Sequence, residues 1–195
     1  MSFNFKKFKK AKFRKGMTYV ELIVVLSIFS IMSAISLFDY RKFEAKVEIK
    51  NLANDIALQI VDAQKSAMAG KLSTLGSFDD KPAYGVYFSL SDNQQFIPFA
   101  DFNDNKSYES GEGLDVIKIT KQSFIKDINI NGGSCSGQTN DVNVVFERPD
   151  STAFVSTSSN GSCSGFSFVD IYVSSADHSA VSHIDIYPTG RIEIK

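Results

Sequence analysis

The stretch GMTYVELIVVLSIFSIMSAISLF, residues 16–38, decides how this chain folds. From Met17 to Phe38 the only residue that is charged at neutral pH is Glu21. As a helix with a rise of about 1.5 Å per residue, this segment would be roughly 33 Å long, which is enough to cross the hydrocarbon core of a bilayer. The sequence therefore predicts a transmembrane helix at residues 17–38.

The leader in front of this segment is basic and contains no acidic residue. Its charged residues are Lys6, Lys7, Lys9, Lys10, Lys12, Arg14 and Lys15. Basic residues that flank a membrane span stay on the cytoplasmic side. We therefore expect a single-pass protein of the cytoplasmic (inner) membrane, with residues 1–16 in the cytoplasm and the residues beyond the span on the other side.

Glu21 is the residue of this segment that needs an explanation, because a carboxylate in an apolar span costs about 2.5–3.5 kcal/mol to insert. Residues 16–21, Gly-Met-Thr-Tyr-Val-Glu, resemble the processing site of type IV prepilins and pseudopilins, where a membrane peptidase cuts after the glycine and methylates the new amino terminus. The resemblance implies that Gly16 ends the leader and that Met17 becomes the N-methylated first residue. In a stack of subunits, Glu21 of one subunit would then neutralise the Met17 amine of its neighbour.

Two segments near the carboxy terminus resemble the GspH/FimT branch of minor pilins and pseudopilins. Residues 144–150 end in Arg148-Pro149-Asp150, and residues 184–192 contain the pair Gly190-Arg191. The resemblance implies a pilin-like, non-enzymatic subunit of a type II secretion pseudopilus or a type IV pilus. Its implied partners are prepilin peptidase, other pilin or pseudopilin subunits, the inner-membrane assembly platform and membrane lipid.

Three other interpretations stay open. An uncleaved signal anchor, carrying a binding domain that never polymerises, would keep Glu21 near the membrane surface. A cleavable secretory signal would end among the small residues 33–36, Ser-Ala-Ile-Ser. A DNA-uptake minor pilin would use Arg191 and Lys195, but Glu193 lies between them. Removing the seven leader charges from 21 Lys and Arg leaves 14 against 22 Asp and Glu, a net charge of about −8 that disfavours nucleic acid as a partner.

The remainder of the chain predicts an α+β fold. Residues 39–69 continue the helix, and Gly70 ends it. One helical face is apolar, at spacings of three and four, through Ala45, Ile49, Leu52, Ile56, Ile60, Ala63 and Ala67. We expect a leader at 1–16, a transmembrane half-helix at 17–38, an amphipathic half-helix at 39–69 and a β-rich extracytoplasmic head at 70–195.

The head begins with a loop at 70–82 and continues as short β-type runs between turns. The expected strands are 84–90, 95–100, 114–120, 124–130, 142–147, 153–156, 166–173, 183–187 and 191–194. Their short connections favour antiparallel pairing, and we expect one sheet packed against the amphipathic half-helix.

The two cysteines, Cys135 and Cys163, each lie in a Ser-Cys-Ser-Gly tetrapeptide of the segment expected outside the cytoplasm. An even number of cysteines in an oxidising compartment favours a disulfide. A bridge that closes a loop of about 28 residues would stabilise the fold by roughly 3–4 kcal/mol.

Residues 101–112 carry oxygen ligands at the spacing of a calcium-binding loop. The candidate ligands are Asp101, Asn103, Asn105, Ser107, Glu109 and Glu112. The match fails at the sixth position, where Lys106 replaces the glycine of the sharp turn, and no flanking helices are expected. A solvated hairpin loop is therefore the favoured interpretation, and calcium binding is the second.

Nothing in the sequence predicts catalysis or another cofactor. The two histidines, His178 and His183, show no ligand spacing to other candidates, and no nucleophile elbow is present. We expect both histidines to lie on the surface or in strands without chemistry of their own.

Overall fold

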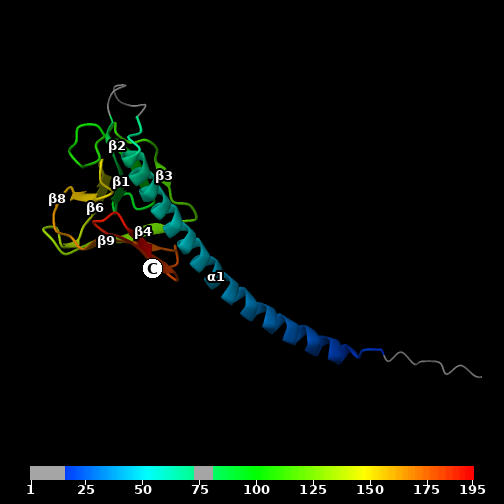
Figure 1. The fold of residues 1–195 in the computed structure, drawn as a ribbon. Helices are drawn as coiled ribbons and strands as arrows, with labels where there is room; N and C mark the ends of the chain where they lie inside the picture. Colours follow the sequence, from blue (N-terminus) through cyan, green and yellow to red (C-terminus); the bar gives the residue numbers. More distant parts are fainter. Residues whose placement is uncertain (1–15, 73–80) are drawn as a thin grey trace, which may run out of the picture. The chain divides into compact units, whose positions relative to one another are not determined.

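The structure is a computed structural model that describes residues 16–72 and 81–195. The expected leader up to residue 15 and residues 73–80 of the expected loop lie outside the described residues. The chain divides into two units, one ending at Arg41 and the other spanning Lys42–Lys195. Helix α1, Tyr19–Met68, begins in the first unit and ends in the second (Figure 1).

Both ends of α1 are capped by their own sequence. At the start, the Glu21 N–H donates to Thr18 Oγ1 at 3.3 Å. At the end, the Gly70 N–H donates to the Ala67 carbonyl at 3.0 Å, and the Lys71 N–H donates to the Ser66 carbonyl at 3.1 Å. Gly70 has a φ of 59°, which glycine adopts without a steric cost and which these two bonds require. The expected helix is thus confirmed to within two residues at each end.

In the first unit, the apolar side chains of the described part of α1 are exposed and do not pack on other residues of the described chain. The exposed fractions of its large apolar side chains run from 45% for Leu22 to 78% for Tyr19. By length and composition, α1 is able to cross a membrane near the amino terminus. This surface needs a covering that the chain itself does not provide among the residues described, and lipid is the covering that its composition fits.

In the second unit, α1 packs on the strands through one apolar stripe. Its buried residues recur at spacings of four and three: Ile49, Ala53, Ile56, Ile60, Ala63 and Ala67. Ala45 and Leu52 border this stripe and are partly buried. The expected apolar face is confirmed. Ala53, which was not expected, lies in the middle of the buried stripe, and Leu52 lies at its edge.

The strands form two antiparallel sheets, not the single sheet expected from the sequence. The six-stranded sheet has the order β3-β2-β1-β6-β7-β8 and the five-stranded sheet the order β11-β10-β9-β4-β5. The first contains β1 Ala83–Ser89, β2 Gln95–Asp101, β3 Ile117–Lys118, β6 Asp141–Phe146, β7 Ala153–Thr157 and β8 Gly161–Cys163. The second contains β4 Phe124–Asn131, β5 Gly137–Gln138, β9 Phe168–Ser174, β10 Val181–Ile186 and β11 Ile192–Ile194.

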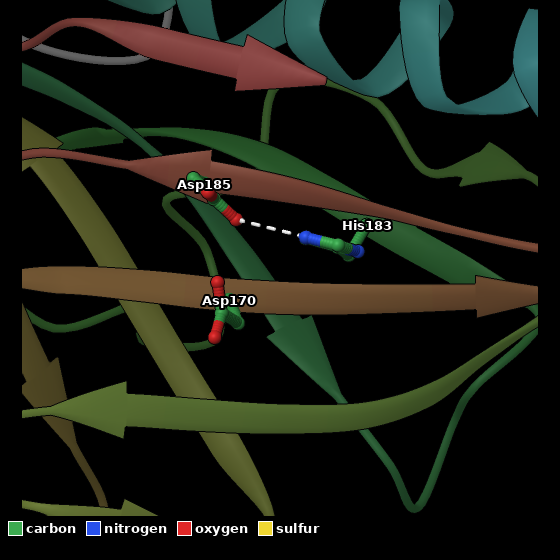
Figure 2. Close-up of side chains that lie close together, drawn as sticks. All are labelled: Asp170, His183 and Asp185. Atoms are coloured by element: carbon green, nitrogen blue, oxygen red, sulfur yellow. Dashed lines mark ion pairs between the residues drawn. The ribbon is translucent and has the colours of Figure 1, made fainter. Parts of the chain in front are cut away.

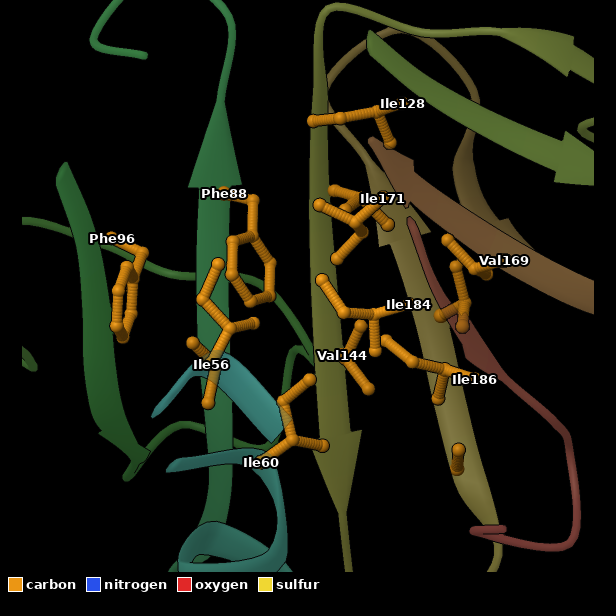
Figure 3. Close-up of a cluster of buried hydrophobic side chains, with 14 of the residues drawn as sticks. Ile56, Ile60, Phe88, Phe96, Ile128, Val144, Val169, Ile171, Ile184 and Ile186 are labelled. Carbon is orange, nitrogen blue, oxygen red and sulfur yellow. The ribbon is translucent and has the colours of Figure 1, made fainter. Parts of the chain in front are cut away.

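The core lies where both sheets and α1 meet (Figure 3). Val169 and Ile171 on β9 and Ile184 on β10 point inward and are fully buried. The residues that alternate with them along each strand face outward. A register shift between Ile125 and Asp127 places a bulge in β4. Because side chains alternate between the two faces along β9 and β10, the five-stranded sheet has an apolar inner face and a polar outer face.

The outer face of the six-stranded sheet carries a second, smaller cluster. Phe99 and Val145 are buried there, and Tyr108 from the segment after β2 covers them. The Tyr108 ring lies 5.1 Å from the Tyr87 ring and 5.6 Å from the Phe99 ring. Gly85 makes this possible, since a Cβ there would lie 2.8 Å from the Phe99 ring. These contacts hold the expected calcium loop against the sheet.

Candidate functional site

The expected processing site lies at the start of α1. Gly16 and Met17 are exposed and precede the helix, and Glu21 lies in its first turn. Thr18 and Glu21 form the Thr-x-x-Glu pattern of a capping box, in which the hydroxyl accepts an N–H of the first turn. A carboxylate there also interacts favourably with the positive end of the helix dipole. Position 21 therefore belongs to the helix cap. The sequence interpretation missed this cap, although the Thr-x-x-Glu spacing is visible in the sequence.

The disulfide between Cys135 and Cys163 is present, as the sequence favoured. Their Cα atoms are 5.4 Å apart, and both residues are buried. Cys135 lies in the connection between β4 and β5, whereas Cys163 ends β8, so the bridge joins one sheet to the other. Ser134 and Ser164 exchange two hydrogen bonds of 3.0 Å beside it. The two Ser-Cys-Ser-Gly tetrapeptides thus form one structural clasp.

In the expected calcium loop, five of the six candidate ligands accept or donate hydrogen bonds within the loop itself. Asp101 accepts the Lys106 N–H at 2.9 Å, and Asn105 Oδ1 accepts the Ser107 N–H at 2.8 Å. Lys106 has a φ of 61°, so it adopts the left-handed conformation for which calcium loops use glycine. The Ser107 hydroxyl points elsewhere, 3.0 Å from Ser156 Oγ.

The acidic residues of this loop are also engaged. Glu109 accepts the side-chain amides of Asn103 and Asn105 at 3.2 and 2.7 Å. Glu112, which is 7% exposed, accepts the Glu109 N–H at 3.0 Å. Hydrogen bonds alone therefore account for the shape of the loop, and calcium binding stays a prediction.

The outer face of the five-stranded sheet holds a cluster that the sequence did not predict. Asp170 on β9 lies directly opposite Asp185 on β10 in the strand register, and His183 is two residues before Asp185 on the same face. Asp170 is 8% exposed and Asp185 is 1% exposed. His183 Nε2 lies 3.6 Å from Asp185 Oδ1 (Figure 2).

The two aspartates influence each other's protonation. Burial raises the pKa of Asp170 to about 6, and the Asp185 carboxylate adds to the rise. Burial also acts to raise the pKa of Asp185, but a proton on Asp170 and the Lys195 ammonium outweigh it and hold that pKa below its usual range. Because the pKa of Asp170 lies above that of an unfolded aspartate, its contribution to stability is lost as the pH rises through about 6.

No protein-family model, curated protein or solved structure matches this chain.

The basic residues considered for nucleic-acid binding pair with acids of the same sheet. The Arg191 guanidinium lies 3.9 Å over the Tyr187 ring, and its Nη1 is 2.9 Å from Glu193 Oε1. Lys195 Nζ pairs with Asp185. Both basic side chains remain about half exposed, at 58% for Arg191 and 52% for Lys195, and the expectation that nucleic acid is not a partner stays a prediction.

Proposed function

We propose that this chain is a minor pilin or pseudopilin, anchored in the inner membrane and assembled into a fibre. The observation that carries the proposal is the first half of α1, whose exposed apolar surface starts directly after the Gly16-Met17 junction and holds one acid, Glu21, in its first turn. Such a helix suits a subunit that is covered first by lipid and later by the helices of neighbouring subunits.

The chemistry of assembly would follow from cleavage between Gly16 and Met17. Cleavage creates an ammonium at Met17, and methylation keeps its positive charge. In the apolar interior of a fibre that charge needs a carboxylate, and Glu21 of an adjacent subunit supplies one. An uncompensated buried charge would cost about 3–5 kcal/mol, which is enough to reject a misplaced subunit.

The ends of the two segments that resemble the GspH/FimT branch come together in the head, where Ser151, directly after the first segment, contacts Gly190 of the second. The Gln64 side-chain amide, on α1, donates to the Ser151 and Gly190 carbonyls, each at 3.2 Å. Gly190 has a φ of 78°, and a Cβ there would collide with the Ser151 carbonyl. Helix α1 is therefore bonded to Gly190 and to Ser151, the residue directly after Asp150, which supports a shared structural role for the two turns.

A second candidate function is an anchored domain that never polymerises. The Thr-x-x-Glu spacing at the helix start favours it, because a glutamate in the first turn of a helix suits a capping box and the helix dipole in a single subunit. The two functions differ in whether the charge of Glu21 matters or only its place in the cap.

Glu21→Gln and Thr18→Val separate these functions. Glutamine keeps the capping pattern and removes the charge, while valine removes the cap and keeps the charge. For a fibre subunit, we expect Glu21→Gln to lower incorporation into sheared fibres by more than about tenfold at an unchanged amount in the membrane. Thr18→Val should stay within about twofold of the unaltered chain. The amounts are measured by immunoblotting of fibre and membrane fractions. Normal incorporation of Glu21→Gln would favour the anchored domain.

A further inference from the structure

We propose that Asp170, His183 and Asp185 form a binding site for a divalent transition-metal ion, such as Zn²⁺ or Mn²⁺. One ligand atom from each residue lies within 4.8 Å of the other two, and all three side chains project from the outer face of the five-stranded sheet (Figure 2). The site lies entirely in the head, so it does not depend on whether the chain enters a fibre.

Two buried carboxylate oxygens of the cluster accept no hydrogen bond among the described residues, although Asp185 Oδ1 lies 3.6 Å from His183 Nε2. Asp170 Oδ1 and Asp185 Oδ1 are fully buried, and neither accepts a hydrogen bond from any residue that the structure describes. Buried polar atoms nearly always have a partner, and two unpaired oxygens from facing carboxylates repel each other. A cation between them would satisfy both oxygens at once.

The second oxygen of each aspartate is already held by another residue. Asn131 Nδ2, on β4, donates to Asp170 Oδ2 at 2.9 Å. Lys195 Nζ, after β11, pairs with Asp185 Oδ2. These contacts fix the orientation of both carboxylates and leave one oxygen of each directed at the site, which is how outer contacts usually prepare metal ligands.

The ligand set selects the kind of metal. Calcium and magnesium prefer oxygen ligands alone, whereas a neutral imidazole combined with carboxylates suits zinc, manganese and other first-row ions. The His183 side chain is 29% exposed, so solvent reaches the cluster from its side. Three protein ligands together with water complete a four-coordinate or larger shell.

A shared proton is the competing explanation. Asp170 in its protonated form would donate to Asp185 and satisfy the pair without a metal. The two explanations differ in the part played by His183, since its imidazole is required for metal binding and is not required for a proton between two carboxylates.

The test is calorimetric titration of the untagged full chain in detergent micelles, stripped of metal by a chelator, with Zn²⁺ and Mn²⁺ at pH 7.5. Asp170→Asn and His183→Asn each remove one ligand. His178→Asn is the matched control, because His178 lies in the turn between β9 and β10 against the Phe124 ring, outside the cluster. Circular dichroism verifies that all variants fold.

We expect one ion to bind per chain and to raise the melting temperature. Affinity should fall by at least about tenfold in Asp170→Asn and His183→Asn and stay unchanged in His178→Asn. No binding of either ion up to millimolar concentration would overturn the proposal. Binding that persists in both ligand variants would also overturn it, as would loss of binding in Asp170→Asn with full affinity in His183→Asn.

Discussion

Ile60→Ala is expected to lower the free energy of unfolding by roughly 2–5 kcal/mol. Ile60 is fully buried in the stripe through which α1 packs on both sheets, in the same cluster as Phe88 and Val144 (Figure 3). Truncation to alanine removes apolar contacts on all sides and leaves a cavity, because the surrounding core relaxes only partially to fill it.

Leu58→Ala is the matched control for this variant. Leu58 lies on the same helix and is 61% exposed, so its truncation should change the free energy of unfolding by less than about 0.5 kcal/mol. The chain has no tryptophan and seven tyrosines, so denaturant unfolding in micelles is followed by tyrosine near-ultraviolet circular dichroism. Equal losses in the two variants would mean that α1 does not dock on the head through this stripe.

Replacing both Cys135 and Cys163 by alanine should lower the free energy of unfolding by roughly 3–4 kcal/mol. The bridge closes a loop with a sequence separation of 28 residues and ties the β4–β5 connection to the end of β8. Without it, the unfolded chain gains the freedom of that loop, which is the main source of the loss in the chain-entropy account.

Reductant provides the control for the disulfide. Dithiothreitol should lower the unfolding midpoint of the unaltered chain to that of the double variant and leave the double variant unchanged. A double variant as stable as the unaltered chain would show that the clasp of the two Ser-Cys-Ser-Gly tetrapeptides holds without its covalent bond.

Much of this fold could be predicted from local patterns. An uninterrupted apolar and then amphipathic run ending at Gly70 predicts α1, and alternation predicts most of the longer strands. The short strands β5 and β8 carry only two and three residues, too few to show a period. The expected strand at 114–120 is wrong in its length. It is reduced to β3, because only Ile117 and Lys118 pair with residues of β2.

The division into two sheets depends on pairing between distant segments, which local patterns do not encode. The same limit applies to the metal cluster. His183 and Asp185 alternate visibly on one strand face, but Asp170 joins them only through the register of β9 with β10. The cap at Thr18 is the opposite case, because its Thr-x-x-Glu spacing is entirely local and can be read from the sequence alone.

The fibre proposal and the metal proposal concern different parts of the molecule and fail independently. The former rests on residues 16–36, whose apolar surface is exposed, and the latter on the outer face of the five-stranded sheet. A head that binds metal on an unprocessed anchor would be an anchored metal-binding domain, whereas a processed chain without metal would be a structural subunit alone.

Intact-mass spectrometry of the chain, co-expressed with a prepilin peptidase and extracted from the membrane, tests the central claim most directly. The fibre account predicts a chain that begins at Met17 and carries one additional methyl group, and it predicts that Gly16→Ala abolishes both changes. A chain of full length, or one cut within residues 33–36, would contradict the account.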